Sequence, residues 1–430
     1  MKQLPIVLPV VAACVFAAGA AMAEDNTGKD AALVARETEA AVVPWPSEPP
    51  EGCPFKPSDD FGGIALTGRF ANYTDGDTFF LSWGADGRLY TPFADTDGNQ
   101  NPPKGSIGVN GIHVYCGNGK GARVGYAVIE GGDPLALKFV DAGTIASPGA
   151  QYNQRYPCAC LHYNGVWYLG TGGAINHSLG PFVGFHISKD NGRTWTPSPL
   201  SADVGKGLFP EPATFKGPVK LGYPHVVDFG KNNGHSRDGK MYLVGHGSAT
   251  RNCGWITGDQ VYLCRVTPSP ETVNDESHYE YFAGHDGDGK AIWSEDFADI
   301  RPIADWHNEM GQVSMTYNAP LKKYLMCVTD GWPVGTGPMN TFLLESDRIT
   351  GPWKMLHYFK HFGPQAYSVS LPSRFISADG RRAWLCLAAN WSSGGRRLNP
   401  ETGKPRGCMY AMSLHEITLN PPNAPGGKSD

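Results

Sequence analysis

The stretch Asp238-Gly239-Lys240-Met241-Tyr242 joins a tight turn to a strand that carries an aromatic side chain. Asp-Gly and Asn-Gly favour two-residue hairpin turns, because glycine accepts the positive φ that such turns need. The same pattern recurs along the chain, at Asp86–Tyr90, Asn164–Tyr168, Asp238–Tyr242, Asn318–Tyr324 and Asp379–Trp384. A pattern that recurs in this way indicates one structural unit used repeatedly.

Each copy is preceded by an apolar strand and followed by a polar loop and another strand. The preceding strands are expected at Thr78–Trp83, Pro157–His162, His225–Phe229, Gln312–Thr316 and Tyr367–Phe375. The following strands are expected at Arg123–Ile129, Phe182–Ile187, Gln260–Val266, Thr341–Leu344 and Cys408–Leu414. Hardly any segment has a helical period. The sequence therefore predicts an all-β fold, a single β-propeller of four-stranded antiparallel blades, with five blades by repeat count and seven possible if the long insertions hide others.

A second motif supports the propeller. Ser188-Lys-Asp190-Asn-Gly192-Arg-Thr194-Trp195 is a complete Asp box, in which the Asp holds a turn between the third and fourth strands and the Trp packs between blades. A partial copy runs from Glu345 to Trp353. The motif favours the fold and says little about chemistry, because such turns lie at the rim of a propeller.

The sequence predicts four segments along the chain. One positive charge, an apolar core from Leu4 to Phe16 and the site Ala21-Met22-Ala23 are typical of a signal peptide over residues 1–23. The lipobox-like Val11–Cys14 leaves lipid attachment at Cys14 as an alternative. We expect a loose extension over 24–60, the propeller over 61–420 and a tail over 421–430, in a secreted or periplasmic protein.

Composition narrows the possible partners. Charged residues make up 18% of the 430 residues and the formal net charge is −5, which argues against nucleic acid as a partner. We expect a monomer without a membrane span. Nine of the ten cysteines follow the leader, so export would permit up to four disulfides. No metal motif is present and no cofactor is expected, although calcium in the central channel is conceivable.

Propeller geometry predicts where a site would lie. All inner strands begin on one face, and the loops between second and third strands open on that same face. Four residues are candidates for catalysis: His225, His246, Tyr156 and Arg155. Eight more are candidates for substrate binding: His177, Arg251, His307, Asn308, Trp332, Gln365, Tyr367 and Trp391. For His225, the alternative is a packed histidine satisfied by a backbone carbonyl.

Two kinds of chemistry compete at this face. A glycosidase needs two carboxyl groups across its cleft. Six aspartates could supply them, although no pair stands out: Asp77, Asp95, Asp228, Asp259, Asp305 and Asp330. A polysaccharide lyase needs a cation for the uronate carboxylate, a base and an acid, for which Arg, His and Tyr suffice. The predicted face is richer in this second set.

Several short stretches resemble a group of secreted propellers related to ulvan lyases and to rhamnose–glucuronate lyases. They are Tyr156–Cys158, Gly184-Phe185 with the Asp box, Pro224–Lys231, Tyr242–Gly247, Gly258–Tyr262 and Gly363–Tyr367. The resemblance covers roughly residues 70–417. It implies proton transfer by His225 and His246, neutralisation of a uronate by Arg155, and Tyr156 as a possible acid. Those lyases have seven blades, whereas the repeats here number five.

The sequence thus favours a polysaccharide lyase that cleaves beside a uronic acid by β-elimination. One alternative is a propeller-type glycoside hydrolase, including sialidase-like exo-action, and another is a non-catalytic glycan-binding propeller. Elimination creates an unsaturated uronate that absorbs ultraviolet light, whereas hydrolysis creates a reducing end without that absorbance.

Overall fold

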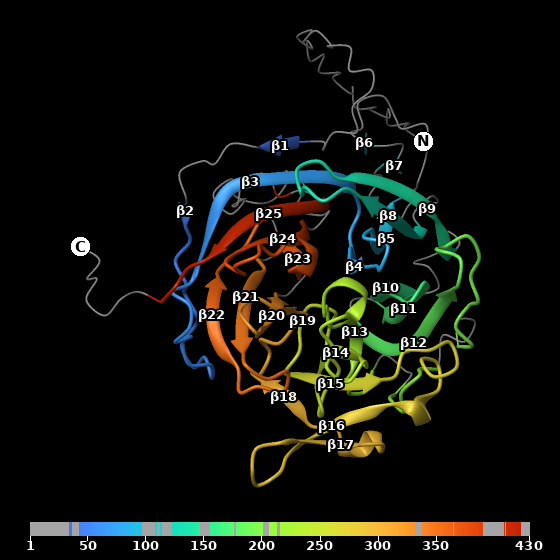
Figure 1. The fold of residues 1–430 in the computed structure, drawn as a ribbon. Helices are drawn as coiled ribbons and strands as arrows, with labels where there is room; N and C mark the ends of the chain where they lie inside the picture. The colour runs from blue at the N-terminus through green and yellow to red at the C-terminus, as the bar shows by residue number, and fades with distance from the viewer. Residues whose placement is uncertain are drawn as a thin grey trace, which may run out of the picture.

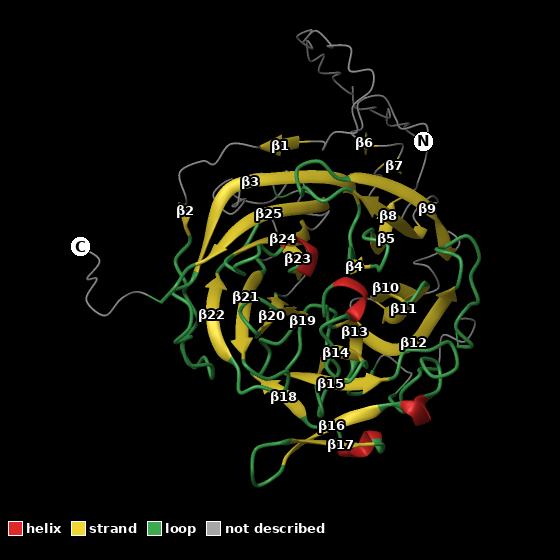
Figure 2. Cartoon of the chain, viewed as in Figure 1, coloured by secondary structure: helices red, strands yellow, loops and turns green. Residues whose placement is uncertain are grey.

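The fold is a closed ring of five blades around a central axis (Figure 1). The computed structural model describes residues 34–36, 43–96, 108–109, 112–113, 123–146, 155–175, 178–200, 206–212, 216–331, 338–363, 365–389, 408 and 410–422. Within these residues, helix is limited to short 3₁₀ turns (Figure 2). They are η2 (Lys231–Asn233), η3 (Glu276–His278), η4 (Phe297–Asp299) and η5 (Ser373–Phe375).

Each blade is an antiparallel sheet whose innermost strand lies at the axis. The first blade contains β4 (Ser82–Trp83), β5 (Leu89–Thr96), β8 (Arg123–Glu130) and β9 (Lys138–Ala146). The second contains β10 (Arg155–Tyr163), β11 (Val166–Ile175) and β12 (Ser178–Ser188). The fourth contains β19 (Gln312–Asn318), β20 (Lys323–Asp330), β21 (Asn340–Ser346) and β22 (Lys354–Phe359).

The third blade is large because two strands, and not one, pair with the outer edge of its third strand. It contains β13 (Gly222–Val226), β14 (Met241–Gly247), β15 (Gln260–Val266), β16 (Glu280–His285), β17 (Ala291–Ser294) and β18 (Pro302–Asp305). Both β16 and β18 pair with β15, along different halves of that strand. The hairpin β16–β17 therefore projects from the ring (Figure 1).

The fifth blade closes the ring by combining the two ends of the chain. Its strands β23 (Ala366–Ser370), β24 (Arg382–Ala389) and β25 (Ala411–Leu419) come late in the sequence, and its next strand is β3 (Ile64–Asp75). β25 pairs with β3 from Leu419 opposite Ile64 to Ala411 opposite Asp75. The short strands β1 (Val34–Arg36) and β2 (Val43–Pro44) add to the other edge of β3. One further hairpin, β6 (Gly108–Val109) with β7 (Ile112–His113), is a separate two-stranded sheet.

The hydrophobic core lies mainly between neighbouring blades. For example, Leu325 and Leu343 of the fourth blade share a cluster with Leu385 and Leu387 of the fifth. At the seam of the first and second blades, Trp195 packs against Trp167 at 5.2 Å and against Tyr126 at 4.9 Å between ring centroids. Burial of such aromatic area holds each blade against the next.

The turn that precedes Trp195 is held by local hydrogen bonds. Asp190 accepts from the backbone N–H of Thr194 at 2.9 Å and from its hydroxyl at 2.7 Å. The Ser188 hydroxyl accepts from the Gly192 N–H at 2.7 Å. Although burial opposes it, this set of bonds, led by that from the Thr194 hydroxyl, lowers the pKa of Asp190 to about 2.

The sequence-based prediction of an all-β propeller with five blades is confirmed. The described residues form five blades, whereas the lyases that the sequence resembles have seven. The expected disulfides are also not found among the described residues, where eight cysteines are free thiols: Cys53, Cys158, Cys160, Cys253, Cys264, Cys327, Cys386 and Cys408. Six of them are buried, and their thiols pack as small apolar groups. None of the described helices is long and apolar enough to span a bilayer.

Ring closure can be tested at Phe70 on β3. Its side chain is buried and stacks on His415 of β25 with ring centroids 5.6 Å apart. We expect Phe70→Ala to lower the free energy of unfolding by about 3–5 kcal/mol, measured by urea denaturation, because a cavity opens in the closing sheet. The exposed Lys138→Ala should change it by less than about 0.5 kcal/mol. Equal free energies of unfolding for the two variants would show that packing of β3 against β25 does not hold the ring closed.

Candidate functional site

The face on which the inner strands begin, called the entry face below, carries two interlocked loops. Loop 248–259 joins β14 to β15, and loop 306–311 leads from β18 into β19. The backbone N–H groups of Trp306 and Met310 donate to the carbonyls of Asp259 and Gly258 at 2.9 and 3.0 Å. A Cβ on Gly258 would lie 2.2 Å from the Met310 carbonyl oxygen, so only glycine permits this contact.

Asp259 is the centre of a polar cluster on these loops. The Arg251 guanidinium donates to both of its carboxylate oxygens, at 2.9 Å from Nε and 2.6 Å from Nη2. His307 Nδ1 lies 3.1 Å from Asp259 Oδ1. Although burial alone would raise the pKa of Asp259, the hydrogen bonds from Arg251, Ser248 and the Asn308 N–H lower it to about 2. Asp259 is therefore ionised at neutral pH.

A pair of carboxyl groups, Glu309 and Asp330, behaves in the opposite way to Asp259. Glu309 follows Asn308 directly, and its side chain shares a hydrogen bond with Asp330 at the end of β20. Asp330 is buried, whereas Glu309 is half-buried. Burial, followed by the charge of Glu309, raises the pKa of Asp330 to about 8, and burial also raises the pKa of Glu309. The pair therefore holds one shared proton at neutral pH.

A fourth carboxyl group, that of Asp77, lies where the chain enters the first inner strand. The Tyr367 hydroxyl of the fifth blade donates to Asp77 Oδ2. Tyr367 in turn packs edge-on against Trp255 of loop 248–259, with 5.0 Å between ring centroids. Ile256 of the same loop accepts a hydrogen bond from the N–H of Gly331, the residue after Asp330. These contacts connect Asp77 to the loop that carries Asp259 and to the strand that carries Asp330.

Backbone strain gathers at this face. Thr78, Tyr223 and Gln365, at the starts of three inner strands, have φ of 60°, 50° and 55°, and Asn308 has φ of 62°. A positive φ is unfavourable for a β-branched or bulky residue, and such outliers persist where surrounding contacts over-determine them, often at functional sites. Ahead of β4, which begins at Ser82, Asp77 pairs with Ala94 through an isolated bridge.

The structure does not support His225 and His246 as proton-transfer groups. His225 Nδ1 donates to the Cys158 carbonyl, and His246 Nε2 donates to the Gly254 carbonyl at 3.1 Å. Burial lowers the pKa of His225 to about 3 and that of His246 to about 4. Both rings therefore stay neutral in ordinary conditions and bind backbone carbonyls, which is the alternative considered for His225.

The remaining predicted residues fall into four groups. Arg251, His307 and Asn308 meet at Asp259, and Gln365 and Tyr367 lie buried at the start of β23. Tyr156 is half-buried and packs against Ala94 and Val124 of the first blade. The rest lie outside the described residues or have side chains outside them: Arg155, His177, Trp332, Trp391 and Asp95.

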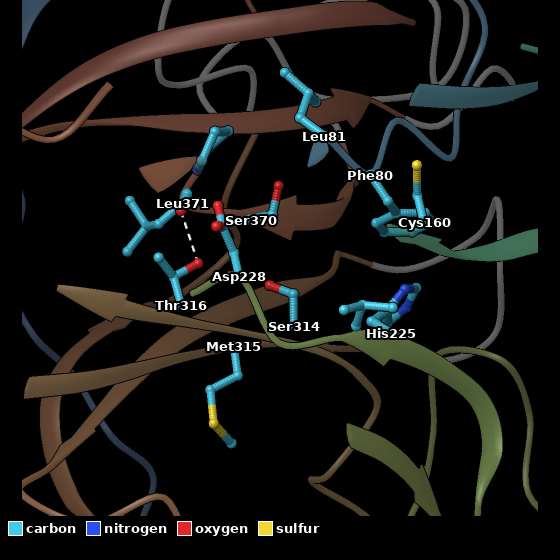
Figure 3. A pocket seen from close by; sticks show the side chains of 12 residues that line it. Phe80, Leu81, Cys160, His225, Asp228, Ser314, Met315, Thr316, Ser370 and Leu371 are labelled. Carbon is cyan, nitrogen blue, oxygen red and sulfur yellow. Dashed lines mark hydrogen bonds between the residues drawn. The ribbon is translucent and has the colours of Figure 1, made fainter. Parts of the chain in front are cut away.

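The axial cavity between the inner strands offers little room for a substrate (Figure 3). Its volume is about 30 Å³, and its walls include Phe80, Leu81, Met315 and Leu371. Asp228 at its edge accepts from the Ser373 N–H and hydroxyl, both at 2.7 Å, so its carboxylate links the third blade to the fifth. A space of this size holds about one water molecule.

Asp305, the last of the six aspartates, accepts a hydrogen bond from the Gln260 side chain and is exposed. Among the described residues, no three His, Cys, Asp or Glu side chains are grouped to hold a metal ion. Glu309 was not a sequence-based candidate. The sequence feature that could have pointed to Glu309 is its place in the loop before an inner strand. Its partner Asp330 is far from it in the sequence, so the pair could not be recognised locally.

No protein-family model matches the chain, and no curated protein matches its sequence. Among solved structures, the GH43_1 enzyme from Xanthomonas citri aligns with a TM-score of 0.42 and 14% identity, over 81% of this chain and 89% of that one. The inulosucrase from Halalkalicoccus jeotgali bound to kestose has a TM-score of 0.43 and 13% identity, over 90% and 91% of the chains.

The α-L-arabinofuranosidase PaAbf62A from Podospora anserina in complex with cellotriose aligns with a TM-score of 0.39 and 12% identity, over 88% of this chain and 96% of that one. No inference about chemistry follows from TM-scores this low. The resemblance to the ulvan-lyase group is not supported by these matches.

The shared proton predicts a pH dependence of stability. Folding raises the pKa of Asp330 from 3.8 to about 8, so between these values the folded chain binds a proton that the unfolded chain has released. The free energy of unfolding should fall as pH rises through this window, by up to about 1.4 kcal/mol per pH unit.

We expect Asp330→Asn to flatten this slope, and Glu309→Gln to reduce it without abolishing it, because burial of Asp330 remains. Urea denaturation at a series of pH values measures the free energy of unfolding of the wild type and of both variants. A wild-type slope in Asp330→Asn would mean that the pair carries no extra proton.

Proposed function

We propose that this propeller hydrolyses glycosidic bonds. One observation carries the proposal: at the entry face, the carboxyl pair Glu309 and Asp330 retains a proton at neutral pH, because burial and the charge of Glu309 raise the pKa of Asp330 to about 8. Hydrolysis of a glycoside needs a protonated carboxyl group for the leaving oxygen and an ionised one for water or for the anomeric carbon. A carboxyl group that keeps its proton at neutral pH is suited to the first of these roles.

In this proposal Glu309, the more exposed member of the pair, delivers the shared proton. The glycosidic C–O bond breaks as that proton goes to the leaving oxygen. Water supplies a hydroxyl group to the anomeric carbon, and its proton goes to a second carboxylate. We assign this second role to Asp77, which is buried at the start of an inner strand and accepts a hydrogen bond from the Tyr367 hydroxyl.

Asp259 is less suited to act on substrate directly. Arg251, His307 and the Asn308 N–H already occupy its carboxylate. Elimination was favoured from the sequence because the predicted face is rich in His, Tyr and Arg. Its two candidate histidines for proton transfer, His225 and His246, are neutral, buried and bonded to carbonyls. The described part of the chain therefore favours the hydrolase alternative over the lyase.

The assay that tests the proposal uses a panel of neutral and uronate-containing glycans. We expect new reducing ends to form without ultraviolet absorbance from an unsaturated uronate. Products with that absorbance would show that the enzyme acts by elimination and not by hydrolysis. Retention of glycans without any product, seen by affinity electrophoresis, would instead indicate a binding protein.

Glu309→Gln tests the assigned acid. We expect kcat to fall by about 10²–10⁴-fold on substrates with a poor leaving group, because the amide cannot donate the proton. The loss should be smaller for an activated aryl glycoside, whose leaving group needs little protonation. Glu295→Gln, an exposed residue after β17, is the matched control and should keep wild-type rates. Full activity of Glu309→Gln on both substrates would remove Glu309 from the mechanism.

A further inference from the structure

The turn that carries Glu309 is held in place by residues that lie outside it. The Glu309 N–H donates to the Trp306 carbonyl at 3.1 Å, which closes a tight turn over 306–309. Its third residue, Asn308, has φ of 62°, a conformation that glycine and asparagine tolerate best in such turns. The backbone of Asn308 therefore sets the direction in which Glu309 leaves the turn.

Two groups hold Asn308 in this conformation. Asp259 Oδ1 accepts from the Asn308 N–H at 2.9 Å, and Arg251 Nη2 donates to the Asn308 side-chain oxygen at 3.1 Å. Asp259 and Arg251 are also bound to each other through two donor nitrogens. Since Asp259 is buried and its carbonyl also binds the Trp306 N–H, the clamp is fixed to the third blade.

We propose that Arg251 and Asp259 are positioning residues that clamp the turn at Asn308 and thereby hold Glu309 against Asp330. The clamp acts through Asn308 and not on a substrate. The proposal builds on the proposed hydrolytic function, in which Glu309 and Asp330 share the proton that is delivered. Its physical basis is the rigid planar fork of arginine, which binds a carboxylate with two hydrogen bonds and which lysine does not reproduce.

Release of the clamp has a consequence that simple loss of stability would not produce. If Glu309 moves away from Asp330, its charge and hydrogen bond no longer favour the proton on Asp330. The groups that face the pair from other elements, Tyr358 of β22 and Cys53 of the N-terminal segment, are unchanged by substitution of Arg251. The proton should therefore leave at lower pH, with the folded state otherwise intact.

Infrared spectroscopy of the full chain measures this proton without any substrate. In the wild type we expect a buried protonated carboxyl band that is lost in Asp330→Asn and disappears as pH is raised. In Arg251→Met this band should titrate at lower pH. Arg265→Met is the matched control, because Arg265 binds Glu280 and Asp238 away from the entry-face loops, and its titration should equal that of the wild type. A wild-type titration in Arg251→Met overturns the clamp.

Kinetics give the second readout. On a substrate of the wild type, Arg251→Met should lower kcat by about 100-fold, the effect of misplacing a reacting group. The alkaline limb of its pH profile should move down in parallel with the infrared titration. If the wild type hydrolyses no glycan, the proposed function fails while the infrared result still decides the clamp.

A second pair of variants covers the case in which Arg251→Met does not fold. Asn308→Gly keeps the positive φ and the N–H donated to Asp259, so its infrared titration should stay close to that of the wild type. Asn308→Ala disfavours the positive φ and should shift the titration down. Identical titrations for these two variants contradict a role for the turn at Asn308.

Discussion

The pairing of β25 with β3 is the constraint on which the rest of the molecule depends. Without β3 the fifth blade would lack its fourth strand, and the ring would be held only by contacts between blade faces. Closure through β3 brings an early and a late part of the described chain into one sheet. In each blade the chain enters at the innermost strand and moves outward, so all five inner strands share one direction and the loops before them meet on a single face.

That shared direction explains how distant residues form one site. Asp77 enters the first blade, the loop of Asp259 belongs to the third, Glu309 leads into the fourth, and Tyr367 begins the fifth. Loop 248–259 connects them, because it contacts Tyr367 through Trp255 and Gly331 through Ile256. The different environments of these carboxyl groups follow from burial and from the placement of one arginine.

The sequence predicted the parts of the fold that depend on local chemistry. Turns such as Asp238-Gly239 and the strands around them can be recognised because glycine requirements and apolar strands are local features. The site was harder to predict because its chemistry depends on contacts across the ring. His225 and His246 were chosen as candidates for their place on one face, but the carbonyls of Cys158 and Gly254 that bind them are not visible in a sequence. Glu309 was missed for the same reason, since its role arises from Asp330 on another strand.

Hydrolysis and elimination both break a glycosidic bond, but they differ in the fate of water. Hydrolysis places a water oxygen on the new anomeric carbon, whereas elimination consumes no water. The most direct measurement is mass spectrometry of the products formed in water enriched in heavy oxygen. The account predicts one labelled oxygen at each new reducing end and products heavier than the parent by one water. Unlabelled products with an unsaturated terminal uronate would contradict it.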